Sequence, residues 1–464
     1  MLDKSLDKNI KNIKKTNNSS DLIIRYLNLK GKKLAILFFE GNISDDKISN
    51  YFMKNIDLII NFSQEKLSNN LFKELENQIP NSNLKIVENS NDIFYLLSSG
   101  FTLILIDNVD KCIAIETRAS LERSISEPTT EVTFKGPKDA FVENHNTNLG
   151  LIRKRIKSES LIMENIIIGE KTKTKTTICY LNDKADKNIV EKLKTRLESS
   201  NYEAIIDSGN VKKIIGESTK TNYPLIKSSE RPDTVCQALL LGKICIIVEN
   251  SPYVLIFPTY FLDYFKTSED YYQKPFNVNF TRLLRIVSFI LTILTPAIYI
   301  SLTTFNQEIV PDPLLISLAL QREGVPFPTY LEIIILTITF EILRESDIRM
   351  PSLMGTSISI VGALVLGDAA VNAGIVSPFA VIIIAVTSVC DLIFSDIDFI
   401  NATRFWRFLF IIGATSLGLV GVTTIMIIFI THLVNASDLN IPFMNQIVPK
   451  TNKSIFIKEK DGEK

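Results

Sequence analysis

Four polar side chains stand inside apolar segments in the second half of this sequence: Glu332, Glu341, Asp368 and Asn372. Asp368 and Asn372 are four residues apart in the run VGALVLGDAAVNAGIVSP, so a helix places both on one face. A carboxylate at the centre of a bilayer costs about 3 kcal/mol on insertion scales, so these groups are expected to face protein or water. The pair could join two helices, lie at an end of the segment near the surface, or line a polar path, and the sequence leaves these alternatives open.

A stripe of small residues runs along the same segment. Its members are Gly355, Ser359, Ala363 and Gly367, at every fourth position, with Gly374 close to the same line. Small side chains at this spacing let two helices approach closely in lipid, where dispersion contacts take the place of the hydrophobic effect. The stripe therefore predicts a helix-packing face.

Several segments are apolar enough to cross a membrane. Residues 283–305 exceed the roughly 20 residues that a bilayer core requires, and Arg282 and Arg285 mark the cytoplasmic side. The other candidates are residues 329–351, 355–375, 379–394 and 406–434. If residues 329–351 lie at the interface because of Glu332 and Glu341, four spans remain and the C-terminal tail is cytoplasmic.

If all five segments cross, the C-terminal tail is outside. The arginines between the later segments, Arg344, Arg349, Arg404 and Arg407, then all lie on the cytoplasmic side. This distribution agrees with the positive-inside rule, which favours five crossings over four.

Residues for metal binding or catalysis are scarce. The 464-residue chain has five cysteines without a CxxC pair and only two histidines, so no zinc spacing exists. It also has no glycine-rich phosphate loop, and no histidine or cysteine accompanies Glu332, Glu341 or Asp368. The 51 basic and 51 acidic side chains give no net field toward nucleic acid. The sequence therefore predicts no enzyme, no catalytic residue, no metal or other cofactor and no nucleic-acid partner.

Short apolar runs separated by helical patterns fill the first part of the chain and predict α/β subdomains. The expected strands are residues 34–39, 57–62, 84–87, 101–107 and 112–117, then 165–170, 177–181, 204–207, 243–249 and 253–257. The predicted fold is an α/β cytoplasmic domain of two subdomains followed by an α-helical polytopic membrane domain. Its parts are a disordered polar tail (1–30), subdomain 1 (31–120), subdomain 2 (121–275), the helical membrane domain with four or five spans (276–449) and a polar tail (450–464).

A basic run lies in the second subdomain, at Arg153, Lys154, Arg155 and Lys157. Such a run on a helix is usually a solvated face. It could also contact acidic lipid headgroups or a partner, since each basic side chain near an anionic surface contributes about 1 kcal/mol.

Four motifs together carry a family resemblance. In chain order they are SISEPTTEVTFKGPKDAFVENHNTNLGLIRKRI (124–156), SERPDTV (229–235), FEILRESDIRMP (340–351) and GALVLGDAAVNAGIVSP (362–378). From about residue 121 to residue 449 the chain resembles the A subunit of the GerA-type spore germinant receptors. Lys135 and Lys138 stand where the family has arginine, which keeps the charge, and the first 120 residues fit only in general layout.

The resemblance implies a function that the residues alone do not. It implies a multi-pass protein of the spore inner membrane, with its N-terminal domain in the cytoplasm. Its partners would be membrane lipid, a transporter-like subunit that binds the nutrient, a lipoprotein, and further copies of itself. Those copies would form a nutrient-gated ion channel. In such a channel, the small-residue stripe would pack one subunit against another, and the burial cost and spacing of Asp368 and Asn372 suggest that the pair lies near the ion path or holds the closed state.

Two other functions stay open at this stage. A secondary transporter component would also place polar groups in the membrane, although the chain has no internal repeat of the kind many transporters show. A non-conducting assembly scaffold would use the same helix-packing face without an ion path.

Overall fold

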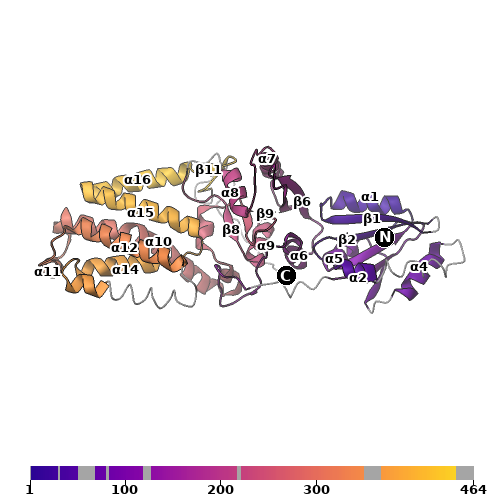
Figure 1. Cartoon of the computed structure of the whole chain (residues 1–464), viewed down its shortest axis with the longest axis horizontal. Coiled ribbons are helices and arrows are strands. Elements are labelled where there is room, and N and C mark those ends of the chain that lie inside the picture. The colour runs from indigo at the N-terminus through magenta and orange to yellow at the C-terminus, as the bar shows by residue number, and fades with distance from the viewer. Residues whose placement is uncertain are drawn as a thin grey trace. The chain divides into compact units, whose positions relative to one another are not determined.

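A computed structural model describes residues 2–29, 32–50, 68–79, 83–118, 127–216, 221–349 and 367–445. Contacts divide the chain into two compact units (Figure 1). The α/β unit consists of Met1–Ser218, Leu225–Thr259 and Asp438–Asn440. The helical unit consists of Thr219–Pro224, Tyr260–Ser437 and Ile441–Lys464.

The first half of the α/β unit is an antiparallel sheet with helices on both faces. Its strands are β1 (Leu22–Leu29), β2 (Lys32–Phe39), β3 (Leu84–Val87), β4 (Phe101–Ile106) and β5 (Cys112–Glu116), in the spatial order β1-β2-β4-β5-β3. Its helices are α1 (Leu6–Thr16), α2 (Asp45–Ile48), α4 (Ser68–Gln78) and α5 (Asn91–Ser98). Alternate residues of the central strands enter two separate cores, one with α1 and α5 and one with α4. Because both faces are covered, these strands are continuous apolar runs.

The structure corrects the prediction of a disordered polar tail at residues 1–30. Leu6, Ile10 and Ile13 form a helical stripe on α1 and are buried, and β1 pairs with β2 over its whole length. The polar composition of this stretch concealed the 3.6-residue period of its few apolar side chains. The strand predicted at residues 57–62 lies outside the described residues.

The second half of the α/β unit is another antiparallel sheet. Its strands are β6 (Leu161–Ile168), β7 (Thr174–Leu181), β8 (Lys227–Ser229), β9 (Ile244–Val248) and β10 (Val254–Phe257), in the order β6-β7-β9-β10-β8. Its helices are α6 (His145–Arg155), α7 (Lys187–Glu198), α8 (Ser208–Gly216) and α9 (Pro232–Leu240). The predicted strand at residues 204–207 is wrong: these residues join no sheet, and the Asp207 carboxylate accepts a hydrogen bond from Gly209 N at the start of α8.

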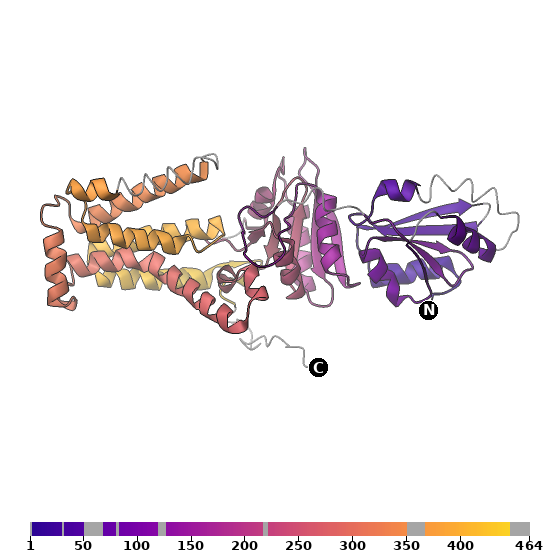
Figure 2. The ribbon, with the colours of Figure 1, turned by 90° about the horizontal axis from the view of Figure 1, so that it is seen from below.

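The helical unit contains α10 (Pro275–Thr304), α11 (Asp312–Gln321), α12 (Thr329–Arg349), α14 (Pro378–Asp391), α15 (Ile397–Leu417) and α16 (Leu419–Asn435) (Figure 2). Residues 367–372 are also helical. Among the described residues, only α10 is both long and apolar enough to cross a membrane, with a mean hydropathy of 2.0 over its most apolar window. The apolar helices α11, α14 and α16 are shorter than such a span.

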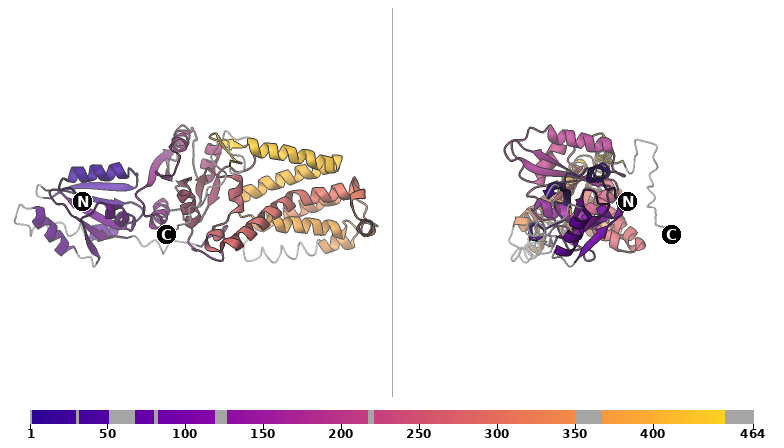
Figure 3. Two further views of the ribbon diagram at one scale, coloured as in Figure 1. Left: turned by 180° about the vertical axis from the view of Figure 1, so that it is seen from behind. Right: turned by 90° about the vertical axis from the view of Figure 1, so that its right-hand side faces the viewer.

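Residues 406–434, expected as one segment, belong to two helices. Gly418 separates α15 from α16 and has a φ of 61°, which glycine adopts without strain. The two helices then pack side by side (Figure 3), so closely that a Cβ on Gly421 would overlap the carbonyl oxygen of Gly413. The prediction failed because the run continues through Gly418 without a charged residue close to it on either side.

The chain turns at two ends of the helical unit. At the α11 end, Asn306 Oδ1 accepts from Leu419 N at 3.3 Å, and Gly374 lies against the backbone of Gly324. The opposite end holds a cluster of rings, which we call the aromatic cluster: Tyr223, Phe261, Tyr264, Phe265, Phe289, Phe394, Phe399, Phe429 and Phe443. Since α16 returns to this end, α10 begins and α16 finishes at the same end of the unit.

One segment of the helical unit comes from the middle of the sequence, between α8 and β8. Tyr223 is 2% exposed, with its ring centroid 5.5 Å from that of Phe399. Trp406 Nε1 donates to Asn222 Oδ1 at 3.3 Å, and Thr221 Oγ lies 2.9 Å from His432 Nε2. Residues 221–224 are thus held by α15 and α16.

Candidate functional site

Asp368 and Asn372 lie in the last two turns of a helix at the α11 end, and both are exposed in the single chain. The helix ends at Gly374, where Gly374 N donates to Val371 O and Ile375 N donates to Ala370 O, both at 2.9 Å. This pair of bonds with a positive φ of 65° is a Schellman cap. Asp368 and Asn372 thus lie near the end of their segment, which was one of the three alternatives that the sequence left open.

The predicted packing stripe lies mostly in undescribed residues. Gly355, Ser359 and Ala363 lie outside the described part of the chain. A Cβ on Gly367 would lie 3.8 Å from Val381 Cγ1, which is an ordinary contact, so α14 does not require glycine there. Gly374 terminates the helix and lies against the backbone of Gly324, and its role in packing between helices stays a prediction.

Glu332 is completely buried at the start of α12. Its Oε2 accepts a hydrogen bond from Ser377 N at 2.8 Å, and its Oε1 lies 3.3 Å from Arg322 Nη2. The Ser377 hydroxyl accepts from Ala380 N and so caps α14. Glu332 therefore links the starts of α12 and α14 to the loop after α11.

Glu341 belongs to a second group of charges, which we call the arginine cluster: Glu341, Arg344, Asp391, Arg404 and Arg407. Glu341 pairs with Arg407 and, at 3.2 Å, with Arg404. Asp391 Oδ2 accepts from Arg344 Nη1 at 2.7 Å and lies 3.3 Å from Arg404 Nε. Three helices, α12, α14 and α15, thus contribute three guanidinium groups and two carboxylates.

Two polar atoms of the arginine cluster are left without a partner among the described residues. They are Asp391 Oδ1 and Arg407 Nε, on side chains that are 2% and 4% exposed. A cavity of about 290 Å³ is lined in part by Asp391 and Arg407. A buried polar atom without a hydrogen bond costs about 1–3 kcal/mol, so a further hydrogen-bonding partner at these two atoms would stabilise the cluster.

The partners of Glu341 were not singled out from the sequence. Arg344, Arg404 and Arg407 were interpreted as membrane-flanking charges, and Asp391 was given no role. The sequence did contain a signal for this cluster. Glu341 and Arg344 are three residues apart and so share a helix face, and the same holds for Arg404 and Arg407. Within the described ranges, no three His, Cys, Asp or Glu side chains come together to hold a metal ion.

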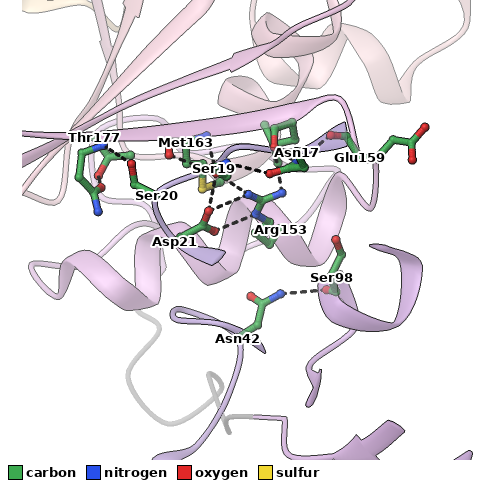
Figure 4. A network of polar contacts seen from close by, with 12 residues as sticks. Asn17, Ser19, Ser20, Asp21, Asn42, Ser98, Arg153, Glu159, Met163 and Thr177 are labelled. Atoms are coloured by element: carbon green, nitrogen blue, oxygen red, sulfur yellow. Dashed lines mark hydrogen bonds and ion pairs between the residues drawn. The ribbon is translucent and has the colours of Figure 1, made fainter. Parts of the chain in front are cut away.

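The α/β unit has its own buried arginine, which joins its two halves (Figure 4). Arg153, 1% exposed, donates from Nε and Nη2 to the two carboxylate oxygens of Asp21 at 3.0 and 2.8 Å. Its other bonds go to Ser19 Oγ and Leu161 O, and its guanidinium carbon lies 3.9 Å from the centroid of the Phe39 ring. We call Arg153, Asp21 and Ser19 the Arg153 network. Neither role predicted for the basic run applies to Arg153, because it is not on the surface.

Two of the sequence motifs bind each other. Residues 127–141, which contain no helix or strand, form a strap. The Glu230 carboxylate accepts from the hydroxyls of Thr129 and Thr130 and from the backbone of Glu131. Arg231, fully buried, donates to Thr133 Oγ and to Pro137 O. The SERPD sequence thus holds the strap in place.

These features define the chain as a helical unit with buried charges, joined to an α/β unit of two antiparallel sheets. Its sequence matches the family described as Bacillus/Clostridium GerA spore germination protein over residues 8–460, and the chain belongs to this family. The resemblance found in the four motifs is therefore confirmed. Several relatives of the chain carry the name spore germination protein.

Three of the proteins that are similar to this chain show the extent of the likeness. Spore germination protein KA of Bacillus subtilis is 34% identical over 459 residues, covering 98% of this chain and 84% of the relative. An uncharacterized membrane protein of the same organism, YfkQ, is 31% identical over 460 residues, covering 98% and 89%. The crystal structure of the N-terminal domain of the A subunit of the Bacillus megaterium spore germinant receptor GerK3 is 30% identical. It covers 56% of this chain and 97% of that one, with a TM-score of 0.44.

Proposed function

We propose that this chain is the membrane subunit of a germinant receptor and that several copies form a nutrient-gated ion channel in the spore inner membrane. Its helical unit crosses the membrane, and its α/β unit lies in the cytoplasm. Its partners are a nutrient-binding subunit and a lipoprotein. The observation that carries the proposal is the exposure of Asp368 and Asn372 on one face of a helix of the helical unit, in a chain that belongs to a germination-protein family.

The distribution of charge supports this orientation. Arg282 and Arg285 at the start of α10 and the three arginines of the arginine cluster lie toward the same end of the helical unit. At the α11 end, the described charges are mostly acidic. Arg322 is the single basic side chain among them, and the acidic ones are Glu308, Asp312, Glu323, Glu332 and Asp368. The positive-inside rule then places the starts of α10 and α15 and the ends of α12, α14 and α16 in the cytoplasm.

The cost of exposing a carboxylate supports assembly. Asp368 is exposed in the single chain, and facing lipid would cost about 3 kcal/mol at the bilayer centre and less toward an interface. A neighbouring copy or a water-filled path removes this cost. Two polar side chains on one face, repeated around a ring, would line such a path.

Residues 221–224 offer a route for coupling. They follow α8 and precede β8 in the chain, and they are bound by α15 and α16. A shift of these two helices would pull directly on the backbone that leads to α8 and β8. The channel and the α/β unit would then respond together.

Cross-linking tests the assembly. In membranes that contain the full chain and its partner subunits, Asn372→Cys should form disulfide-linked multimers on mild oxidation. Ile382→Cys, at an exposed apolar position of α14, is the control and should not. Chains that stay monomeric at both positions would remove the ring.

Ion flux tests the path. In proteoliposomes of the assembled receptor, Asp368→Asn should change potassium efflux at least tenfold, whereas Glu323→Gln, an exposed acid at the same end, should leave it unchanged. A ladder of multimers with unaltered efflux would favour the scaffold. Saturable nutrient uptake by this chain without multimers would favour the transporter component.

A further inference from the structure

The cavity beside the arginine cluster is a groove between α12 and α14 with two kinds of surface. Its apolar walls include Phe340, Leu343, Ile384, Ala385 and Val389. Its polar end is formed by Glu341, Arg344, Asp391 and Arg407. A ligand that fills it therefore needs a long apolar part and a polar head.

The charges at the polar end specify the sign of that head. The two arginines and two carboxylates that line the polar end balance each other, and Arg404, which pairs with both carboxylates from outside the groove, gives the arginine cluster one positive charge in excess. Arg407 Nε can donate a further hydrogen bond, and Asp391 Oδ1 can accept one. An anion with its own hydroxyl donor would satisfy the excess charge and both atoms.

We propose that this groove binds an anionic glycerophospholipid whose headgroup carries a hydroxyl, of which phosphatidylglycerol is the simplest. The phosphate oxygens accept from the guanidinium groups of Arg344 and Arg407. The headgroup hydroxyl donates to Asp391 Oδ1, and an acyl chain lies along the apolar walls. The site rests on the membrane placement proposed above but requires neither a ring nor ion conduction.

The position of the groove favours a lipid over a free anion. With the proposed orientation, the arginine cluster lies toward the cytoplasmic leaflet, where anionic headgroups concentrate. A free phosphate would occupy only the polar end and would leave the apolar walls without contacts. Basic pockets between membrane helices on this side are suited to anionic headgroups.

Native mass spectrometry of the full chain in detergent measures the lipid directly. The chain is incubated with phosphatidylglycerol, phosphatidic acid or phosphatidylcholine of identical acyl chains. Phosphatidylglycerol should be retained at least about fivefold more than phosphatidylcholine, as one favourable charge contact implies. It should also exceed phosphatidic acid, which lacks the hydroxyl. Equal retention of all three would overturn the proposal.

Two variants distinguish the contribution of the lipid headgroup to binding from that of the acyl chain. Arg344→Gln should remove the preference for phosphatidylglycerol, and it should fold because Asp391 keeps Arg404 as a partner. Its control is Arg282→Gln, an arginine paired with Asp270 away from the groove. Ala385→Phe should fill the wall and reduce retention of every lipid, whereas Ile382→Phe, exposed on the same helix, should not.

The source of the phosphate is tested by competition. Millimolar inorganic phosphate should not displace phosphatidylglycerol from the wild-type chain. Displacement would mean that the polar end takes a free anion, and the lipid proposal would fail. Since lipid retention is measured on the isolated chain, its loss leaves the channel proposal intact, and a chain without ion flux can still bind the lipid.

Discussion

Each unit of this protein buries a group of arginines and carboxylates, and the two groups differ in balance. In the Arg153 network, one guanidinium meets one carboxylate, and each of its three nitrogens donates a hydrogen bond. In the arginine cluster, three guanidinium groups meet two carboxylates, and two buried atoms have no partner among the described residues. Among the described residues, the first group has a partner for every buried polar atom, whereas the second does not.

This difference separates a structural role from a binding role. A buried ion pair recovers its desolvation cost only when its geometry is good and every remaining hydrogen-bonding position is satisfied. The Arg153 network meets that condition and joins the two sheets of the α/β unit. The arginine cluster does not meet it, and it adjoins a groove. Removing charges from the two groups should therefore have opposite patterns of effect.

The largest effect is expected from Arg153→Met, which leaves Asp21 buried without a countercharge. Breaking such a pair costs about 3–5 kcal/mol, which corresponds to a fall of roughly 10 °C in the unfolding temperature of the α/β unit. Circular dichroism of the full chain in detergent measures this transition. Lys154→Met, an exposed neighbour on α6, is the control and should change it by less than 2 °C, about the effect of an ordinary surface substitution. If the two variants melt alike, the Arg153 network does not join the sheets.

In the arginine cluster, the sign of the removed charge should decide the outcome. Asp391→Leu leaves three arginines with one carboxylate and should cost about 2–3 kcal/mol, because Arg344 and Arg404 lose their shared partner. Arg344→Met leaves two arginines with two carboxylates and should cost less than about 1 kcal/mol. Trp406 is the single tryptophan and lies in the helical unit, so its fluorescence follows the unfolding of that unit alone. If both variants lost the same free energy of unfolding, the cluster would not carry an excess of positive charge.

The strands of the two sheets were largely predictable, since runs such as β4 and β9 consist almost entirely of apolar residues and are buried on both faces. The beginning of the chain was not, because the apolar residues of α1 are spaced among lysines and asparagines and the apolar run of β1, LIIRYLNL, directly follows this polar stretch. Their stability comes from pairing with β2 and packing under the sheet, which local composition does not contain. Gly418 was missed for the opposite reason, because no charged residue close to it marks the break in the run.

The polar residues of the helical unit were predictable only where they interrupt an apolar run. Glu332 and Glu341 were found in this way. Their partners come from distant positions, and Arg404 and Arg407 flank an apolar run, where basic residues are common for reasons of topology alone. Arg153 shows the same limit, because the local sequence of a buried arginine does not differ from that of an exposed basic run. Only the fold brings Asp21 to it.

Acid should destabilise the α/β unit through one buried histidine, His145. The pKa of His145 falls from its ordinary 6.5 to about 4, because the side chain is buried and because Lys175 lies nearby. His145 Nε2 lies 2.8 Å from Thr177 Oγ, and Nδ1, where a second proton would go, has no partner among the described residues. The unfolded chain therefore takes up a proton that the folded chain excludes between pH 6.5 and pH 4. The contribution of His145 to stability is complete above pH 6.5 and is lost as the pH falls through this window.

At pH 5 the loss relative to pH 7 should be about 2 kcal/mol. It should lower the unfolding temperature of the α/β unit measured by circular dichroism. His145→Asn, which does not titrate, should make the transition less sensitive to acid by this amount. An unchanged pH dependence in the variant would mean that other groups carry the acid sensitivity.

The smallest effect tests whether the Arg153 network is as complete as its geometry indicates. The Ser19 hydroxyl donates to Asp21 Oδ1 at 2.5 Å and accepts from Met163 N and Arg153 Nη2 at 2.7 and 3.0 Å. Ser19→Ala removes all three bonds but keeps the ion pair, and it leaves Met163 N buried without an acceptor. We expect a cost of about 1.5 kcal/mol, well below that of Arg153→Met.

The adjacent Ser20→Ala is the matched control, because Ser20 is exposed and its hydroxyl accepts a single bond from Asn165 N. It should cost less than about 0.5 kcal/mol. Hydrogen exchange of β6 in the full chain distinguishes the two, since Met163 N lies in that strand and should exchange faster only in Ser19→Ala. Equal exchange in both variants would mean that the ion pair holds the two sheets without the hydroxyl. The completeness that distinguishes this network from the arginine cluster would then reside in Arg153 and Asp21 alone.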